Sequence, residues 1–168
     1  PATGAKPVLG TGVNVAVLDT GIDYTHIDLA ANYAGGYDFV NNDADPRDDH
    51  WHGTHVSGTI AAVDNGVGVV GVSPGVRLYG VKVLNSSGSG AWSGIIAGID
   101  WCVSNNMHVA NLSLGGPTDP GTTVRSAFDN AYLKGLVIVA SAGNDGAGTN
   151  TVGYPARYDS VIAVAATT

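Results

Sequence analysis

The chain has 168 residues, of which 44% are hydrophobic and only 12% are charged. This composition excludes an intrinsically disordered chain, and the length suffices for one domain with a buried core. The formal net charge of −7 gives a surface that repels phosphate groups and suits cations such as calcium, so nucleic acid is not an expected partner. No apolar run approaches the roughly 18 residues that span a bilayer, so no membrane partner is expected.

Short apolar runs and helix-like spacings predict the elements along the chain. Residues 13–18 form an apolar run that ends at Asp19, which indicates a buried strand, and the acidic, Asn-rich residues 36–49 indicate a loop. The other predicted elements are a helix over 52–63, a strand over 77–83, a flexible break over 86–90, a helix over 92–105, a strand over 109–114, a helix over 122–134 and strands over 136–140 and 161–165.

The alternation of apolar strands with helices predicts an α/β fold, a parallel sheet with helices on both faces. Neither an internal repeat nor a linker interrupts the pattern, so residues 1–168 are expected to belong to a single domain. In sheets of this kind the functional site lies beyond the carboxyl ends of the strands.

Side chains suited to proton transfer stand at these strand ends. Asp19 follows the first strand, His52 opens the first long helix, and Asn144 comes soon after the strand over 136–140. In a parallel sheet, these groups converge on one edge. A carboxylate can fix a histidine in one tautomer, the histidine can accept a proton from a nucleophile, and an amide can donate to a developing oxyanion.

His50, His52 and His55 lie within six positions, and this cluster permits other interpretations. His50 and His52 are spaced to chelate zinc, and Asp48 and Asp49 could complete a tetrahedral site. A third interpretation gives the histidines no joint role. From this stretch alone, three interpretations stay open: proton transfer, zinc binding, or no joint role.

Four motifs in a fixed order carry a resemblance to a known family. They are Asp19-Thr20-Gly21-Ile22-Asp23, His52-Gly53-Thr54-His55-Val56, Asn111-Leu112-Ser113-Leu114-Gly115-Gly116 and Ala140-Ser141-Ala142-Gly143-Asn144. The series resembles the subtilisin-like serine proteases, or subtilases, across nearly the whole chain. The resemblance implies a subtilisin-like fold, incomplete in this chain, and an endopeptidase that hydrolyses peptide bonds.

The resemblance implies a role for each matching residue. Asp19 would orient the base, His52 would act as general base and then general acid, and Asn144 would donate to the oxyanion, while His55 would be a structural neighbour. An extended polypeptide substrate would be held by strand addition and by a side-chain pocket. The residues implied in this binding are Gly88, Ser89 and Gly90, then Ser113, Leu114 and Gly115, and, for the pocket, Ser141, Ala142 and Gly143.

The family's nucleophilic serine lies in a Gly-Thr-Ser-Met-Ala-like turn, and the sequence contains no such stretch. Ser73 fits a Gly-x-Ser-x-Gly elbow, but the residue after that serine must donate its backbone N–H, and Pro74 has none. Cys102, inside a predicted helix, is expected to be a small buried residue. The serine is therefore expected on a complementary C-terminal fragment, and this chain alone is expected to be inactive.

The resemblance also implies a structural Ca²⁺ site. Asp28 stands where many subtilases carry a calcium-binding Asp, and residues 63–69 resemble the family's metal loop. The implied oxygen ligands are the Asp28 carboxylate, the Asn65 side chain and the carbonyl groups of Val63, Val67 and Val69. The loop over 41–49 is a second candidate, although a solvated acidic loop explains the same composition.

Two functional hypotheses follow. In the first, the chain is the Asp- and His-bearing part of a secreted, extracellular serine endopeptidase, and the resemblance also allows a propeptide or a protein inhibitor as a partner. In the second, the chain is a non-catalytic module that binds extended peptides or has a structural role.

Overall fold

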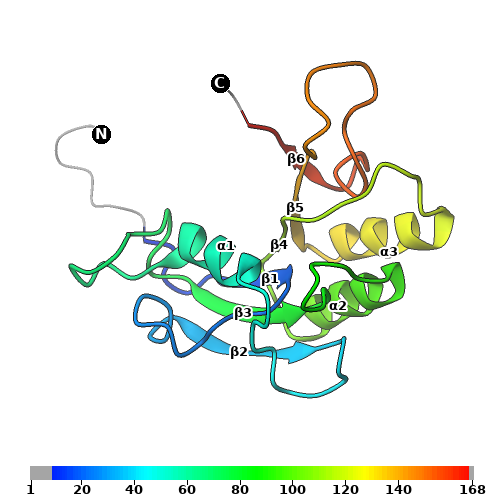
Figure 1. The fold of residues 1–168 in the computed structure, drawn as a ribbon. Helices are drawn as coiled ribbons and strands as arrows, with labels where there is room; N and C mark the ends of the chain where they lie inside the picture. The colour runs from blue at the N-terminus through cyan, green and yellow to red at the C-terminus, as the bar shows by residue number, and fades with distance from the viewer. Residues whose placement is uncertain (1–8, 167–168) are drawn as a thin grey trace.

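The computed structural model describes residues 9–166, and they form a parallel sheet of six strands with three helices (Figure 1). The strands are β1 (Asn14–Asp19), β2 (Tyr33–Asp38), β3 (Arg77–Lys82), β4 (Val109–Leu112), β5 (Val137–Ser141) and β6 (Ile162–Val164), in the spatial order β2-β3-β1-β4-β5-β6. The helices are α1 (His52–Ala61), α2 (Trp92–Ser104) and α3 (Thr122–Leu133). Because every pairing is parallel, the carboxyl ends of the strands lie at one edge.

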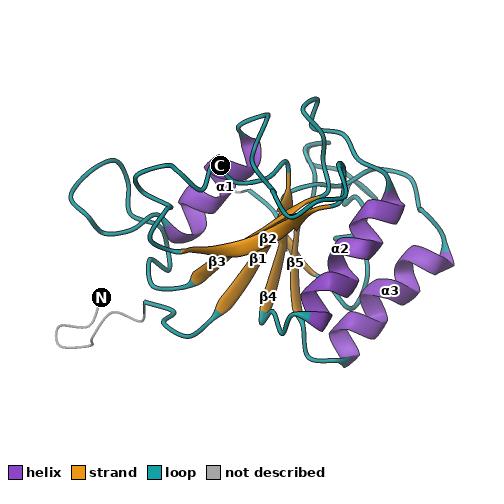
Figure 2. Ribbon diagram, turned by 90° about the horizontal axis from the view of Figure 1, so that it is seen from below, coloured by secondary structure: helices purple, strands orange, loops and turns teal. Residues whose placement is uncertain are grey.

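Successive residues of β1 face opposite sides of the sheet and join two separate hydrophobic cores. Leu18 belongs to the core that includes Ile99 of α2 and Phe128 of α3, all three fully buried. Val17 belongs to the other core, together with Ala61 of α1. Figure 2 shows α1 on one side of the sheet and the two longer helices on the other. The predicted fold class, a parallel sheet with helices on both faces, is confirmed.

One predicted boundary is wrong, because residues 36–38 belong to β2 and not to a loop. β2 reads Tyr-Ala-Gly-Gly-Tyr-Asp and lacks the β-branched residues that favour strands. It pairs with β3, and Gly36 lies so close to Gly80 that a Cβ on Gly36 would overlap the Gly80 carbonyl group. The missing side chain of Gly36 therefore permits a strand that the side-chain pattern does not predict.

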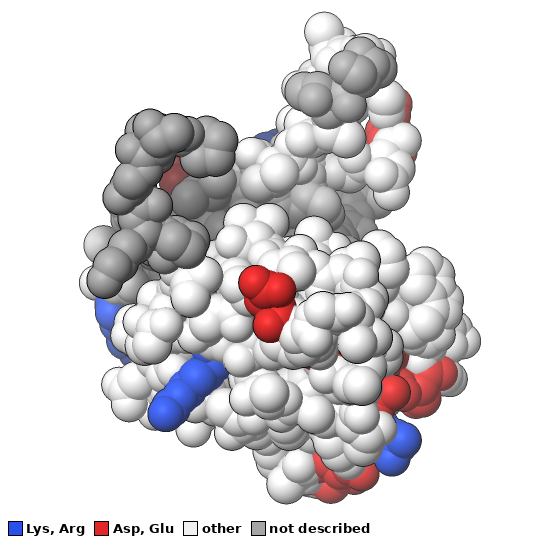
Figure 3. All heavy atoms as spheres, turned by 90° about the vertical axis from the view of Figure 1, so that its left-hand side faces the viewer, with Lys and Arg blue, Asp and Glu red and all other residues white. Residues whose placement is uncertain are grey.

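The other predicted strands and helices are present, with ends that differ by one or two residues. On the face seen in Figure 3, charged side chains are sparse among uncharged ones, in keeping with the 12% charged residues of the sequence. Within residues 9–166, no helix has the length and apolar character needed to cross a membrane.

Candidate active site

At the carboxyl edge of the sheet, Asp19 and His52 form a hydrogen-bonded pair. His52 Nδ1 lies 2.8 Å from Asp19 Oδ1 and 3.0 Å from Oδ2. The Asp19 side chain is fully buried, whereas 34% of the His52 side chain is exposed. Because an ionised carboxylate can only accept hydrogen bonds, Nδ1 carries the proton and Nε2 has a free lone pair. The imidazole can thus accept a proton at Nε2, and the carboxylate stabilises the resulting cation.

A close backbone contact sets the distance between these two side chains. Gly21, which has a φ of +112°, follows β1 and lies against Gly53 in the first turn of α1. A Cβ on Gly53 would overlap the Gly21 carbonyl oxygen and lie 3.1 Å from Cβ of Asp19. Gly53 N also donates to Thr20 Oγ1 at 2.9 Å. The helix can approach the strand end this closely only because position 53 has no side chain.

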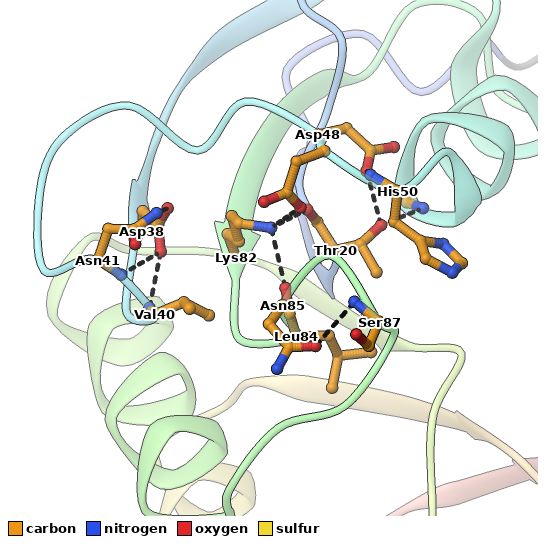
Figure 4. A network of polar contacts seen from close by, with 12 residues as sticks. Thr20, Asp38, Val40, Asn41, Asp48, His50, Lys82, Leu84, Asn85 and Ser87 are labelled. Carbon is orange, nitrogen blue, oxygen red and sulfur yellow. Dashed lines mark hydrogen bonds and ion pairs between the residues drawn. The ribbon is translucent and has the colours of Figure 1, made fainter.

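Asp48 caps the first turn of α1 and connects it to the segment after β1 (Figure 4). Its carboxylate accepts hydrogen bonds from the N–H groups of His50, Trp51 and Thr54 and from the hydroxyls of Thr20 and Thr54. Burial acts to raise the pKa of Asp48, but the hydrogen bonds, that of the Thr54 hydroxyl foremost, outweigh it and lower the pKa from 3.8 to about 2. Asp48 is therefore ionised across the neutral and mildly acidic range.

Lys82, the last residue of β3, places a buried ammonium group among three oxygen acceptors (Figure 4). The side chain is only 1% exposed. Its Nζ donates to the carbonyl oxygens of Thr20 at 2.6 Å and Leu84 at 3.0 Å, and to the carboxylate of Asp49. All three ammonium donors have partners. Lys82 thus joins the segment next to Asp19 to the segment that leads into the predicted peptide-binding loop.

Two segments predicted to hold an extended peptide line one cleft of about 350 Å³. The first is residues 88–90, and the second contributes Leu114 and Gly115. Ser113 is not among the lining residues, and its hydroxyl accepts a hydrogen bond from the Asn111 side chain at 3.1 Å. The structure therefore brings together two segments that are far apart in the sequence.

The Asn85 side chain holds the first of these segments in a turn. Its oxygen accepts hydrogen bonds from the backbone N–H groups of Ser87 at 2.9 Å and Ser89 at 3.1 Å. The Asn85 N–H donates in turn to the Ser89 carbonyl group at 2.8 Å. These contacts fix the turn that forms one wall of the cleft.

The third predicted segment lies beside the second. Ser141 ends β5, the carbonyl group of Ala142 accepts a hydrogen bond from Gly153 N at 2.9 Å, and Tyr154 pairs with Gly116 through two backbone hydrogen bonds. Residues 153–154 therefore connect the two segments. Gly143 and Asn144 are exposed in the loop that follows β5.

The three clustered histidines are not arranged around a common point in the described part of the chain. Within residues 9–166, no three His, Cys, Asp or Glu side chains are placed to hold a metal ion. The rings of His50, His52 and His55 surround the Trp51 indole instead, at centroid distances of 5.2, 5.6 and 6.4 Å. Cys102 is fully buried in α2, and burial raises the pKa of its thiol to about 12, so it is not a nucleophile.

The residues of the predicted calcium site gather around Asp28, which is 5% exposed. Asn65 Nδ2 donates to Asp28 Oδ1 at 3.2 Å, Val69 N lies 3.5 Å from Oδ2, and Val63 N donates to the Asp28 carbonyl group. Asn65 Oδ1 accepts a hydrogen bond from Val67 N. Asp28 offers a buried carboxylate, a ligand type that Ca²⁺ prefers, but N–H donors face it in this arrangement, and the Asn65 amide would have to turn its oxygen towards the ion.

The second calcium candidate, the loop over 41–49, does not bring its carboxylates together. Asp45 accepts a hydrogen bond from a tyrosine hydroxyl at 2.8 Å, Asp48 caps α1, and Asp49 pairs with Lys82. Each carboxylate has a different partner, so this loop offers no common centre for a cation.

Comparison with known proteins shows the family. The sequence profile described as "Subtilase family" matches residues 10–168. The chain belongs to the subtilase family. This confirms the resemblance drawn from the four motifs.

Several characterised subtilases are similar to this chain. It is 52% identical over 164 residues to Subtilisin DY from Bacillus licheniformis, a match that covers 96% of this chain and 59% of that protein. It is 51% identical over 167 residues to Subtilisin Savinase from Lederbergia lenta, covering 99% of this chain and 60% of that protein. The chain thus spans less than two thirds of the length of these relatives.

The fold is similar to that of a solved subtilase. The crystal structure of a cold-adapted subtilisin-like serine proteinase matches with a TM-score of 0.86 and 40% sequence identity. The match covers 98% of this chain and 58% of that one. The subtilisin-like fold is therefore confirmed over the part of the domain present in this chain.

Substitution of Gly53 tests the contact that places His52. Gly53→Ala adds a Cβ where the Gly21 carbonyl oxygen lies, so we expect a loss of about 1–3 kcal/mol in the free energy of unfolding, measured by urea titration. Gly58→Ala is the matched control in the same helix, since a Cβ there meets nothing within 4 Å. The control should gain up to about 1 kcal/mol. Equal changes in the free energy of unfolding at the two positions would contradict the view that the close contact requires a glycine at position 53.

The cap on α1 predicts a pH-dependent contribution to stability. Because the pKa of Asp48 is lowered from 3.8 to about 2 on folding, its contribution is fully present above about pH 4 and is lost as the pH falls towards 2. The difference in unfolding free energy between the native chain and Asp48→Asn should therefore shrink over that interval. Urea titrations at a series of pH values measure it, and a difference that stays constant would rule out this role for the carboxylate.

Proposed function

We propose that this chain is the part of a serine endopeptidase that supplies the Asp19–His52 pair and the oxyanion donor Asn144. The nucleophilic serine would lie on a separate fragment. Residues 1–168 would be one partial peptidase domain, of which residues 1–8 and 167–168 lie outside the described part. The observation that carries the proposal is the geometry of the pair, a fully buried carboxylate bound to Nδ1 of a histidine that is 34% exposed.

The geometry supports an acyl-transfer mechanism. As the serine hydroxyl attacks the carbonyl carbon of the substrate, His52 Nε2 accepts its proton, and Asp19 stabilises the imidazolium. Asn144 donates a hydrogen bond to the oxyanion. His52 then gives the proton to the leaving amine, and an acyl-enzyme remains. Water, activated by the same imidazole, releases the acid product and restores the serine.

The cleft supports binding of an extended polypeptide. Backbone groups of residues 88–90 and 113–115 would pair with the peptide on its two sides, as strands of a sheet do. Ser141, Ala142 and Gly143 would line the pocket for one side chain. A propeptide or a protein inhibitor would occupy the same cleft. The family resemblance supports an extracellular location.

The first experiment asks whether a complementary fragment supplies the serine. Intact-mass spectrometry of the denatured sample shows whether a second fragment is present, and a fluorophosphonate probe labels an activated serine. We expect labelling of a companion fragment. His52→Ala should slow labelling by about 10²–10⁴-fold because the general base is lost. His55→Ala, one helical turn further on, is the matched control and should label normally. A single unlabelled species near 16.9 kDa would favour a non-catalytic peptide-binding module.

We also propose a structural Ca²⁺ site formed by Asp28, Asn65 and the carbonyl groups of Val63, Val67 and Val69. Because binding to the folded state alone stabilises it, Ca²⁺ at about 100 times its Kd should add about 2.7 kcal/mol to the free energy of unfolding. Thermal melts with Ca²⁺ and with Mg²⁺ measure the effect. Asp28→Asn should abolish the Ca²⁺ response, whereas Asp45→Asn should keep it. A response to neither ion in the native chain would refute the site.

A further inference from the structure

Trp51, which immediately precedes His52, has a strained backbone and an exposed side chain. Its φ is +124°, a value that bulky residues rarely adopt, and 63% of the residue is exposed. Asp48 holds this conformation by accepting the N–H groups of His50 and Trp51 at 2.9 and 3.0 Å. Packing in a core does not explain a large apolar residue at such a position. Strain of this kind is typical of functional sites.

The indole lies between the candidate base and the rim of the peptide cleft. It stacks on the His50 ring, with an interplanar angle of 21°, and meets the His52 ring edge-on. On the cleft side, a Cβ on Gly88 would lie 3.5 Å from Nε2 of His50. Trp51 is thus one ring away from the base and separated from the cleft wall by His50.

Beyond the indole the surface is hollow, and its lining combines exposed apolar side chains with acidic ones. Trp51 lines a cavity of about 1010 Å³ together with Val70 and Val72, which are 56% and 82% exposed. In the described part of the chain, no residue lines both this cavity and the peptide cleft. Trp51 thus borders a hollow that is separate from the peptide cleft.

We propose that Trp51 is a specificity-determining residue that contacts the first substrate residue after the scissile bond and favours an aromatic side chain there. The inference rests on the proposed function, in which His52 gives its proton to the leaving amine. The residue that carries this amine must lie beside His52, where the exposed indole stands.

The surroundings favour an aromatic occupant over a cationic one. Four carboxylates line this cavity, and each has a partner in the described part of the chain. Asp48 accepts the hydrogen bonds that cap α1, Asp49 pairs with Lys82, and Asp23 and Asp28 accept hydrogen bonds from the Thr25 hydroxyl and the Asn65 amide. An aromatic side chain gains both burial of apolar area and ring–ring contact from the indole. A basic side chain would gain contact with the ring face, but it would find no free carboxylate with which to form an ion pair.

The test uses the chain together with its companion fragment and three quenched peptides that differ only in the residue after the scissile bond. We expect kcat/KM to be about five- to tenfold higher for Phe than for Gly at that position, with Arg in between. Trp51→Phe should keep the preference. Trp51→Gly should reduce it to less than about twofold, although glycine relieves the positive φ and should leave the unfolding midpoint equal or higher.

Tyr132→Ala is the matched control, because Tyr132 is another exposed aromatic residue, near the end of α3. It should keep the full preference for Phe. An undiminished preference in Trp51→Gly, or a preference for Arg over Phe in the native protein, would overturn the proposal.

A binding measurement separates this inference from the proposed function. If the native protein hydrolyses none of the peptides, the proposed function fails, and the inference is tested by nuclear magnetic resonance on this chain with the dipeptide amides Phe-Leu and Gly-Leu. Phe-Leu amide should shift the one indole N–H resonance that is missing in Trp51→Phe, and Gly-Leu amide should not. Equal shifts, or none, would overturn the role of Trp51.

Discussion

The contact between Gly21 and Gly53 is the constraint on which the candidate site depends. Parallel strands bring their carboxyl ends to one edge, but a sheet edge alone does not fix the distance between a strand residue and a helix residue. Here the backbone of the turn after β1 touches the backbone of α1, so Asp19 and His52 meet within hydrogen-bonding distance. Because this contact is between two backbones, no side chain has to be ordered to form it. The Asp19–His52 pair is therefore preorganised.

One half-buried and one buried ionic group reinforce this arrangement from two directions. Asp48 satisfies donors at the start of α1, and Lys82 satisfies acceptors at the ends of β1 and β3. Both groups would be costly inside the protein without partners, and both have partners throughout. The polar network thus connects His52, Asp19 and the segment that leads to residues 88–90.

The sequence predicts the fold class from its apolar runs, and the residues at the element ends together with the four motifs predict that Asp19 and His52 lie together. It does not predict β2, whose pairing depends on the close approach of Gly36 to the backbone of Gly80 in β3. It also leaves Lys82 unnoticed, although a single cation between Val81 and Val83 is a signal of a buried charge with dedicated partners. The strain at Trp51 has no signature in the sequence, since it follows from hydrogen bonds that Asp48 makes only in the folded chain.

The division of the interior into two cores has a consequence for how this family can vary. Leu18 and Val17 are neighbours in the chain, yet their side chains lie on opposite sides of a hydrogen-bonded sheet and share no core. Changes of side-chain volume around α2 and α3 alter the free energy of unfolding. Their effects are expected to add to those of changes around α1, because the sheet separates the two packed regions. Evolution can in this way remodel the side that carries the two longer helices while the helix that carries the histidine keeps its place.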